Sequence, residues 1–323
     1  MDQPLRAPWA TRFLAVLGFL AVVVLAWVLV LRPWYLRWGA TDAELGRALP
    51  GDGVMPPSTT QETRAITIRA RPEEIWPWLV QMGQDRAGMY SFSLIENLLG
   101  CQMPAVTHIV PAWQERRVGE KVWLYPPDKL GGVGHVVVVG LEPRQALVLA
   151  SPLPGAAPGQ FLGTWAFTLL PIDEVSTRLV VRGRGDLTGT SVLGRVLDRL
   201  TWEPAHYVME RRMLRNLTSL AEGDLTRPVD DGVEVLLWLL SGAMLVASLV
   251  RVLLGRSWKR SLASSFVGWA VLVTLLLVQP HPGVGIALVS TAAVALGFAL
   301  APPQVKSSAP KAVTRNTTER STV

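Results

Sequence analysis

The chain alternates between long apolar stretches with few or no charges and one central region of mixed polarity. A helix needs about 20 consecutive apolar residues to cross a hydrocarbon core of about 30 Å. Four stretches approach or reach this length: Phe13–Leu31, Val235–Leu254, Leu262–Val278 and Gly283–Ala301. We therefore predict four transmembrane helices around one water-soluble domain. The expected division is an N-terminal tail and first helix over 1–37, a soluble domain over 38–230, three helices over 231–301, and a disordered basic tail over 302–323.

The first apolar stretch has two interpretations, a cleaved signal peptide or a permanent anchor. The apolar part of a signal peptide spans only about 7–15 residues and precedes a small-residue cleavage site. Here a stretch of aromatic residues between arginines follows instead, from Arg32 to Trp38. Such aromatics are typical of the membrane–water interface. We interpret the stretch as an uncleaved anchor.

Basic residues next to the apolar stretches predict the orientation. The loop after Val235–Leu254 is basic, and so is the C-terminal tail, whereas the turn over 279–283 carries no Lys or Arg. Cytoplasmic loops are enriched in Lys and Arg. We therefore expect both termini in the cytoplasm and the soluble domain outside it, although Arg32 and Arg37 favour the reverse. The four basic residues of the loop are Arg251, Arg256, Lys259 and Arg260.

The soluble region begins with a pattern of period two, from Arg64 to Ala70, which predicts a strand. Arg71-Pro72 then opens a helix, and Ser93–Gly100 predicts a second, short one. Further strands are expected over Lys121–Tyr125, His135–Leu141, Ala146–Ala150, Gly163–Leu170 and Arg178–Arg184. A long helix over Glu203–Ala221 closes the region.

This order of elements predicts an α+β fold. Strands in succession pair antiparallel, and the long helix has one apolar face, with Arg211, Arg212 and Arg215 mostly on the other. A curved antiparallel sheet around the long C-terminal helix buries the apolar faces of both. The apolar positions of that helix are Ala205, Val208, Met209, Met213, Leu217 and Leu220.

Three stretches of the soluble region resemble the SRPBCC superfamily, which includes START, Bet v 1-like and polyketide cyclase/dehydrase-like proteins. They run over 69–79, 81–90 and 203–213, and the latter two look like a membrane-anchored bacterial branch of unknown function. The resemblance covers Thr63 to Ala221 and none of the membrane segments. It implies a helix-grip fold with a deep apolar cavity that holds a lipid, sterol or polyketide. The superfamily spans carriers, cyclases and hydrolases, so the resemblance does not decide the function.

The charge balance excludes one class of partner. The chain has a formal net charge of +6 and a pI near 9.9, which is typical of nucleic-acid binding. However, residues 38–230 contain 19 basic and 21 acidic residues, so the excess lies beside the apolar stretches and in the tails. Membrane orientation explains that excess, and we expect no nucleic-acid partner. The single cysteine, Cys101, excludes an intramolecular disulfide and a zinc site built on cysteine pairs.

Two polar groups are candidates for catalysis. Asp85 and Arg86 fit either a polar pair at a cavity mouth, with Tyr90 behind, or a turn cap and a structural ion pair. His206 has Glu203 and Glu210 at helical spacings, which suits either a general base of raised pKa or an ordinary hydrogen-bonded histidine. The chain has four histidines and none in a close pair, so we expect no metal and no cofactor.

Aromatic and methionine side chains are candidates for a cavity lining. Large aromatics in one domain serve equally as core packing or as the wall of a ligand cavity. The candidate lining residues are Trp78, Met82, Tyr90, Trp113, Trp165, His206, Met209 and Met213.

Three functions stay open at this point. The first is a membrane-tethered domain that binds a hydrophobic small molecule or lipid. The second is a cyclase- or hydratase-type enzyme with His206 or Asp85 as the acid–base group. The third is a structural or assembly protein. The predicted partners are the lipid bilayer and an apolar ligand, and the oligomeric state is left open.

Overall fold

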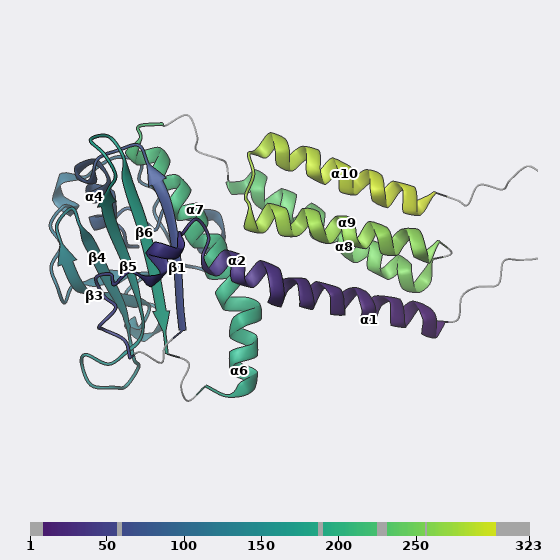
Figure 1. The fold of residues 1–323 in the computed structure, drawn as a ribbon, viewed down its shortest axis with the longest axis horizontal. Coiled ribbons are helices and arrows are strands. Elements are labelled where there is room, and N and C mark those ends of the chain that lie inside the picture. Colours follow the sequence, from purple (N-terminus) through teal and green to yellow (C-terminus); the bar gives the residue numbers. More distant parts are fainter. Residues whose placement is uncertain (1–8, 57–59, 187–189, 225–230, 256, 302–323) are drawn as a thin grey trace, which may run out of the picture.

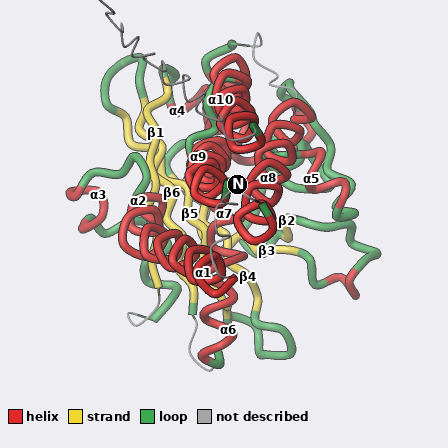
Figure 2. Tube along the Cα trace, turned by 90° about the vertical axis from the view of Figure 1, so that its right-hand side faces the viewer, coloured by secondary structure: helices red, strands yellow, loops and turns green. Residues whose placement is uncertain are grey.

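A sheet-and-helix domain lies at one end of a bundle of long apolar helices (Figure 1). The computed structural model describes residues 9–56, 60–186, 190–224, 231–255 and 257–301. The predicted basic tail 302–323 and Arg256 lie outside the described residues. The long helices run side by side, and Figure 2 views them nearly end on.

Within the residues that the structure describes, four helices are long and apolar enough to cross a membrane, as predicted. The first runs without a break over 28 residues, through α1 (Trp9–Ala26), the π-helical turn η1 (Trp27–Leu31) and α2 (Arg32–Leu36). It therefore extends beyond the predicted Phe13–Leu31 at both ends, through the aromatic stretch. The other three are α8 (Asp231–Leu254), α9 (Trp258–Leu277) and α10 (Pro282–Leu300).

In the described part of the chain, six strands form one antiparallel sheet in the order β1-β6-β5-β4-β3-β2. This confirms the α+β prediction, with β1 starting earlier than expected and ending at Ile68. A register shift between Val138 and Gly140 disturbs the pairing of β3 and β4, and such bulges bend a strand. The strands are β1 (Thr60–Ile68), β2 (Lys121–Trp123), β3 (His135–Glu142), β4 (Ala146–Pro152), β5 (Phe161–Pro171) and β6 (Thr177–Gly185).

The helix α7 (Glu203–Ala221) has the bounds that the sequence predicts. Its apolar residues Met213, Leu214 and Leu217 are buried in the main core, which the inner face of the sheet and α4 (Pro72–Val80) complete. The short α5 (Ser93–Leu98) follows α4, and α6 (Val192–Leu197) with the π-helical turn η4 (Asp198–Trp202) leads directly into α7. The sheet thus holds the long helix against its inner face.

The outer face of the sheet is covered by the segment that links α2 to β1. This segment includes α3 (Asp42–Gly46), which begins with a capping box on Thr41. Arg182 of β6 is buried beneath it and pairs with Asp52 at 2.7 Å. The linker is therefore part of the packed domain.

The polar face of α7 packs on the ends of the membrane helices, although its arginines suggest a solvated surface. The Tyr207 hydroxyl donates to the Leu277 carbonyl at 3.0 Å. Arg211 donates to the Val278 carbonyl, and Gln279 donates from its side-chain amide to the Val208 carbonyl at 2.7 Å. The turn between α9 and α10 therefore lies on α7, at the same end of the bundle as the domain (Figure 1).

A buried ion-pair group fixes the same face to α8. Arg212 is only 2% exposed in its side chain and donates to Glu234 at 2.8 Å and to Asp231 at 2.7 Å. Both acids lie in the first turn of α8. Buried charges are tolerated only where they are paired and hydrogen-bonded, so this group specifies one placement of α7 against α8.

We predict that Arg212→Met destabilises the protein by about 3–5 kcal/mol, because it leaves buried carboxylates without their guanidinium. The free energy of unfolding in lipid bicelles, from chemical denaturation, measures the loss. The matched control is Arg144→Met, which removes an exposed arginine whose pair with Glu73 spans 3.9 Å and is worth about 0–1 kcal/mol. Equal losses for the two variants would contradict the prediction.

Candidate functional site

A cavity of about 1050 Å³ lies between the sheet, α7 and the ends of the membrane helices. Apolar side chains of the strands form its inner wall, including Val136 of β3 and Leu149 of β4. Met209 and Met213 contribute the wall on the α7 side. The cavity reaches into the main core of the domain, because Val136, Leu149 and Met213 also belong to that core.

The opposite wall comes from the membrane helices. Trp27 of η1 and Trp238 of α8 line the cavity, and so do Val273 and Leu276 of α9. These side chains lie on spans that are apolar enough to cross a bilayer. The cavity is therefore shared between the domain and the membrane helices.

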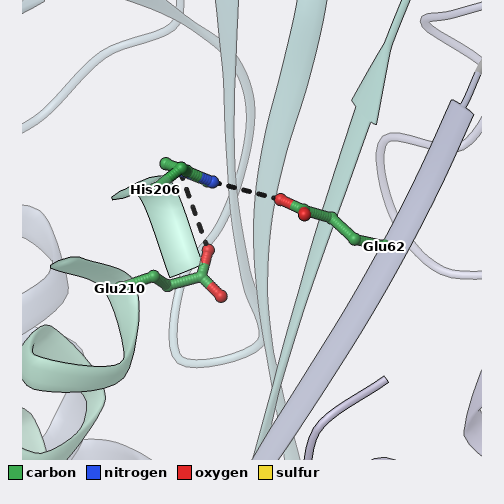
Figure 3. Close-up of side chains that lie close together, drawn as sticks. All are labelled: Glu62, His206 and Glu210. Carbon is green, nitrogen blue, oxygen red and sulfur yellow. Dashed lines mark ion pairs between the residues drawn. The ribbon is translucent and has the colours of Figure 1, made fainter. Parts of the chain in front are cut away.

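A polar cluster lies in the cavity wall where α7 faces β1 (Figure 3). The His206 ring places Nδ1 at 3.2 Å from Glu62 Oε1 and Nε2 at 4.0 Å from Glu210 Oε2. Arg64 joins the two carboxylates, at 2.8 Å from Glu210 and 2.5 Å from Glu62. Trp165 donates its indole N–H to Glu210 at 2.8 Å. Each carboxylate thus has at least two partners.

The cluster shifts the protonation of its members. Burial opposes ionisation of Glu62, but the charges and hydrogen bonds of Arg64 and His206 prevail and hold the pKa of that carboxyl well below its usual range. Burial also disfavours a charged His206, yet the hydrogen bond to Glu62 and the charges of Glu62 and Glu210 outweigh it and raise the pKa of the ring. Arg64 and Glu210 are each 1% exposed, while 30% of the His206 side chain is exposed. His206 is therefore the most accessible ionisable group of the cluster, since the Glu62 side chain is 16% exposed.

The expected partner Glu203 does not contact His206. It accepts hydrogen bonds from Arg32 at 2.8 Å and from the Tyr35 hydroxyl at 2.5 Å. The sequence-based pairing with Glu203 is therefore wrong, because the start of α7 faces α2 and draws this carboxylate to the first membrane helix. Glu210, the other expected partner, does lie beside the ring.

Asp85 and Arg86 do not form the polar pair considered from the sequence. Arg86 pairs with Glu120 at 2.5 Å and donates to the Val80 and Trp113 carbonyls. Asp85 is exposed and is not among the cavity-lining residues. In the described part of the chain, Arg86 is a structural side chain that fastens the loop after α4.

The eight candidate lining residues divide into two groups. Trp165, His206, Met209 and Met213 line the cavity. The other four belong to the domain core away from it, where Tyr90 donates its hydroxyl to the Trp78 carbonyl at 3.1 Å. This second group is Trp78, Met82, Tyr90 and Trp113.

Sequence reasoning missed Glu62 and Arg64 as site residues, although a signal was present. Both are in phase with Ile66 and Ile68 along β1, and alternate residues of a strand share one face. Charges in phase with apolar residues indicate an inward-facing polar cluster.

Glu96 of α5 was missed as well, and it also lines the cavity. Burial, with the charge of Asp231, raises the pKa of its carboxyl to about 7. A single glutamate on a short helix carries no pattern that separates it from a solvated one.

A metal ion fits the cluster poorly. Glu62, His206 and Glu210 present ligand atoms within 4.8 Å of one another, which is compatible with a cation by distance. However, the guanidinium of Arg64 already lies between the carboxylates and supplies the positive charge. A second cation would have to displace a buried arginine that is itself paired, so we assign the cluster to the cavity wall.

The arrangement of the sheet and helix identifies the fold. A single antiparallel sheet, in this strand order, holds a long C-terminal helix on its inner face. That is the helix-grip arrangement implied by the sequence resemblance. The domain has a helix-grip fold. Membership of the SRPBCC superfamily, and of a membrane-anchored branch within it, stays a prediction from the sequence resemblance.

Comparison with known proteins carries no argument about the fold or the function of this chain. No family model and no curated protein matches the chain. Solved structures that it resembles include a Polyketide_cyc-like protein from Corynebacterium glutamicum, with 15% identity over 52% of this chain and 88% of that one, at a TM-score of 0.24. An AHSA1-like protein from Rhizobium etli shares 17% identity over 52% and 84%, at a TM-score of 0.26. A protein from Mesorhizobium loti shares 19% over 50% and 96%, at a TM-score of 0.27.

We predict a pH-dependent contribution of His206 to stability. Its pKa is raised in the folded state, so its contribution is complete below the unfolded pKa of about 6.5 and is lost as the pH rises through the folded pKa. The stability difference between the parent and His206→Gln should therefore shrink between pH 6 and pH 9. Thermal unfolding in nanodiscs at both pH values measures it.

His135→Gln is the control, because burial and Lys121 lower the pKa of His135. The parent should become more stable relative to His135→Gln as the pH rises, which is the opposite of the trend expected for His206→Gln. A His206→Gln difference that is the same at both pH values would contradict the prediction.

Proposed function

We propose that this protein is a membrane-anchored binding domain that holds a hydrophobic small molecule or lipid in its internal cavity. The observation that carries the proposal is the cavity wall, which the core of the domain and the ends of the membrane helices form together. Its volume of about 1050 Å³ is near the upper end of small-molecule sites, which span about 300–1,000 Å³. An apolar ligand of that size gains most of its binding free energy from area removed from water, at about 25 cal/mol per Å².

The position of the polar cluster favours binding over catalysis. Arg64 donates to one oxygen of Glu62 and one of Glu210, Trp165 donates to the other oxygen of Glu210, and His206 lies beside the other oxygen of Glu62. Among the ionisable members, His206 has the most exposed side chain. Because its charged groups pair with one another, the cluster stabilises the contact between α7 and β1 in the cavity wall. It also presents one polar edge on which a ligand's polar end can hydrogen-bond.

An enzyme is the second candidate, and one observation favours it. His206 lines the cavity with a raised pKa, which is a property of general acid–base groups. A cyclase- or hydratase-type reaction on an apolar substrate would use this ring. Loss of such a group lowers a rate by about 10²–10⁴ while binding changes little.

The side of the membrane is also part of the proposal. We place the domain outside the cytoplasm, because Lys259 and Arg260 lie in the first turn of α9, and α9 begins at the end of the bundle away from the domain (Figure 1).

We predict that filling the cavity abolishes ligand retention. Val136→Trp adds an indole to the inner wall, whereas Val175→Trp adds the same group at an exposed turn where Val175 is 66% exposed. Mass spectrometry of lipids and small molecules that remain on the natively purified protein measures the effect. The first variant should lose the bound species by at least tenfold and the second should keep it.

His206→Gln separates the two candidates in the same experiment. A binding domain should retain its ligand in this variant, because apolar burial dominates the affinity. Chemical conversion of the bound species by the parent that is lost in His206→Gln would favour the enzyme. Absence of any bound species in the parent, or its full retention in Val136→Trp, would contradict the binding proposal.

A further inference from the structure

We propose that two exposed apolar flanks of the cavity mouth insert into the membrane interface, so that the cavity exchanges its ligand directly with the adjacent lipid leaflet. The flanks are the segment Val192–Trp202, which comprises α6 and η4, and the end of α5 from Leu94 to Leu99. Only the exchange depends on the proposed function; the membrane contact of the flanks stands by itself.

The first flank has an apolar stripe with no cover in the described structure. Its apolar residues recur at spacings of one and three, which places them on one side of a helix. Leucine and valine at such exposure are unusual for a surface in water when they form a continuous patch. The stripe residues and their exposed fractions are Val192 70%, Leu193 67%, Val196 44%, Leu197 51% and Leu200 52%.

The direction of this flank suits a membrane surface. In Figure 1, α6 runs across the direction of α1 at the end of the bundle nearest the domain, and Figure 2 shows it extended in the plane perpendicular to the helices. A helix that lies flat in the interface buries its apolar side and keeps its polar side toward the headgroups. Arg195 and Arg199 lie off the middle of the apolar stripe and carry the charge that attracts lipid phosphates.

The second flank is held beside α8. The ring of Phe92, which precedes α5, lies 4.8 Å from the ring of Trp238. Leu98 is 76% exposed and Leu99 70% exposed at the end of α5. An apolar surface next to a transmembrane helix continues the surface that this helix presents to lipid.

Both flanks border the cavity. Leu99 and Trp202 both line it, and both are about 70% exposed. A side chain that is at once lining and exposed marks the rim of an opening. Trp27 and Trp238, at the domain ends of their helices, line the same cavity, and tryptophan is enriched at the membrane–water interface.

The bilayer is the occupant that these observations favour. The first flank lies at the end of the helix bundle nearest the domain (Figure 1), and the second lies against α8, a helix long and apolar enough to cross a membrane. The opening between them consequently faces the leaflet. A membrane amphiphile with an apolar chain reaches the cavity from there without crossing water.

The position of the first flank is tested on the full chain in nanodiscs of phosphatidylcholine and phosphatidylglycerol. Leu193→Cys in a Cys101→Ser background carries an environment-sensitive fluorophore, and Val175→Cys is the matched control. Spin-labelled phosphatidylcholine, with the nitroxide high on its acyl chain, should quench the first label at least threefold more than the second. Aqueous iodide should show the reverse order.

Two results would overturn the membrane contact. Equal quenching of both labels by iodide would place α6 in water. Protection of the Leu193→Cys label from both quenchers would show that protein covers the stripe, as a second copy of this chain would.

The exchange is tested with the double variant Leu193→Asp/Leu197→Asp. Transfer of a fluorescent phospholipid from donor vesicles into the cavity should slow at least tenfold, with the amount bound at equilibrium unchanged. An unchanged transfer rate would overturn the role of the flank in exchange. If the parent protein binds no phospholipid, both the proposed function and the proposed lipid exchange are contradicted. The quenching result still decides whether the first flank contacts the membrane.

Discussion

The buried ion pairs along α7 fix the soluble domain to the membrane helices, and the shared cavity depends on them. Arg212 pairs with the first turn of α8, and Glu210 pairs with Arg64 on β1. Charges buried in this way are stable only in the one arrangement that pairs them, because an unpaired charge loses its hydration without compensation. The helix therefore has a defined place between the sheet and the bundle. A flexible tether would leave the cavity without its membrane-side wall.

Both faces of α7 are consequently committed to protein contacts. The apolar face closes the core with Met213 and Leu217, and the polar face holds the turn between α9 and α10 through Arg211 and Tyr207. The cavity lies at the N-terminal half of the helix, where Met209 and His206 face it. Under the proposed binding function, the bilayer is the nearest source of an apolar ligand, because the cavity lies where the domain meets the long apolar helices. The same junction exposes the apolar stripe of α6.

The sequence predicted those features that depend on local periodicity. The α7 bounds followed from one apolar face between Pro204 and Ala221, and the four spans followed from length and lack of charge. The succession of strands was enough for an antiparallel sheet. Arg64 lies two residues before Ile66 in the first strand, so both side chains were expected on the same face of the sheet. This alternation was not interpreted as a sign of a buried polar cluster.

Features that depend on distant contacts could not be predicted in this way. Nothing near His206 in the sequence indicates Glu62, because the pairing arises only when β1 packs beside α7. The arginines of α7 were expected mostly opposite its apolar face, and the burial of Arg212 there depends on its pairing with the distant first turn of α8. The polar candidates Asp85 and Arg86 were plausible by residue type alone, and packing assigns Arg86 to Glu120.

Photo-crosslinking from the bilayer measures most directly whether the cavity is a lipid site. The full chain is incorporated into nanodiscs that contain a phospholipid with a diazirine on its acyl chain, and the adducts are mapped by peptide mass spectrometry. We expect adducts at Met213 and Leu149 inside the domain, in addition to those on outward-facing residues of the bundle such as Leu14 and Val294. Adducts confined to the outward-facing residues, with none in the cavity, would contradict a membrane-derived ligand.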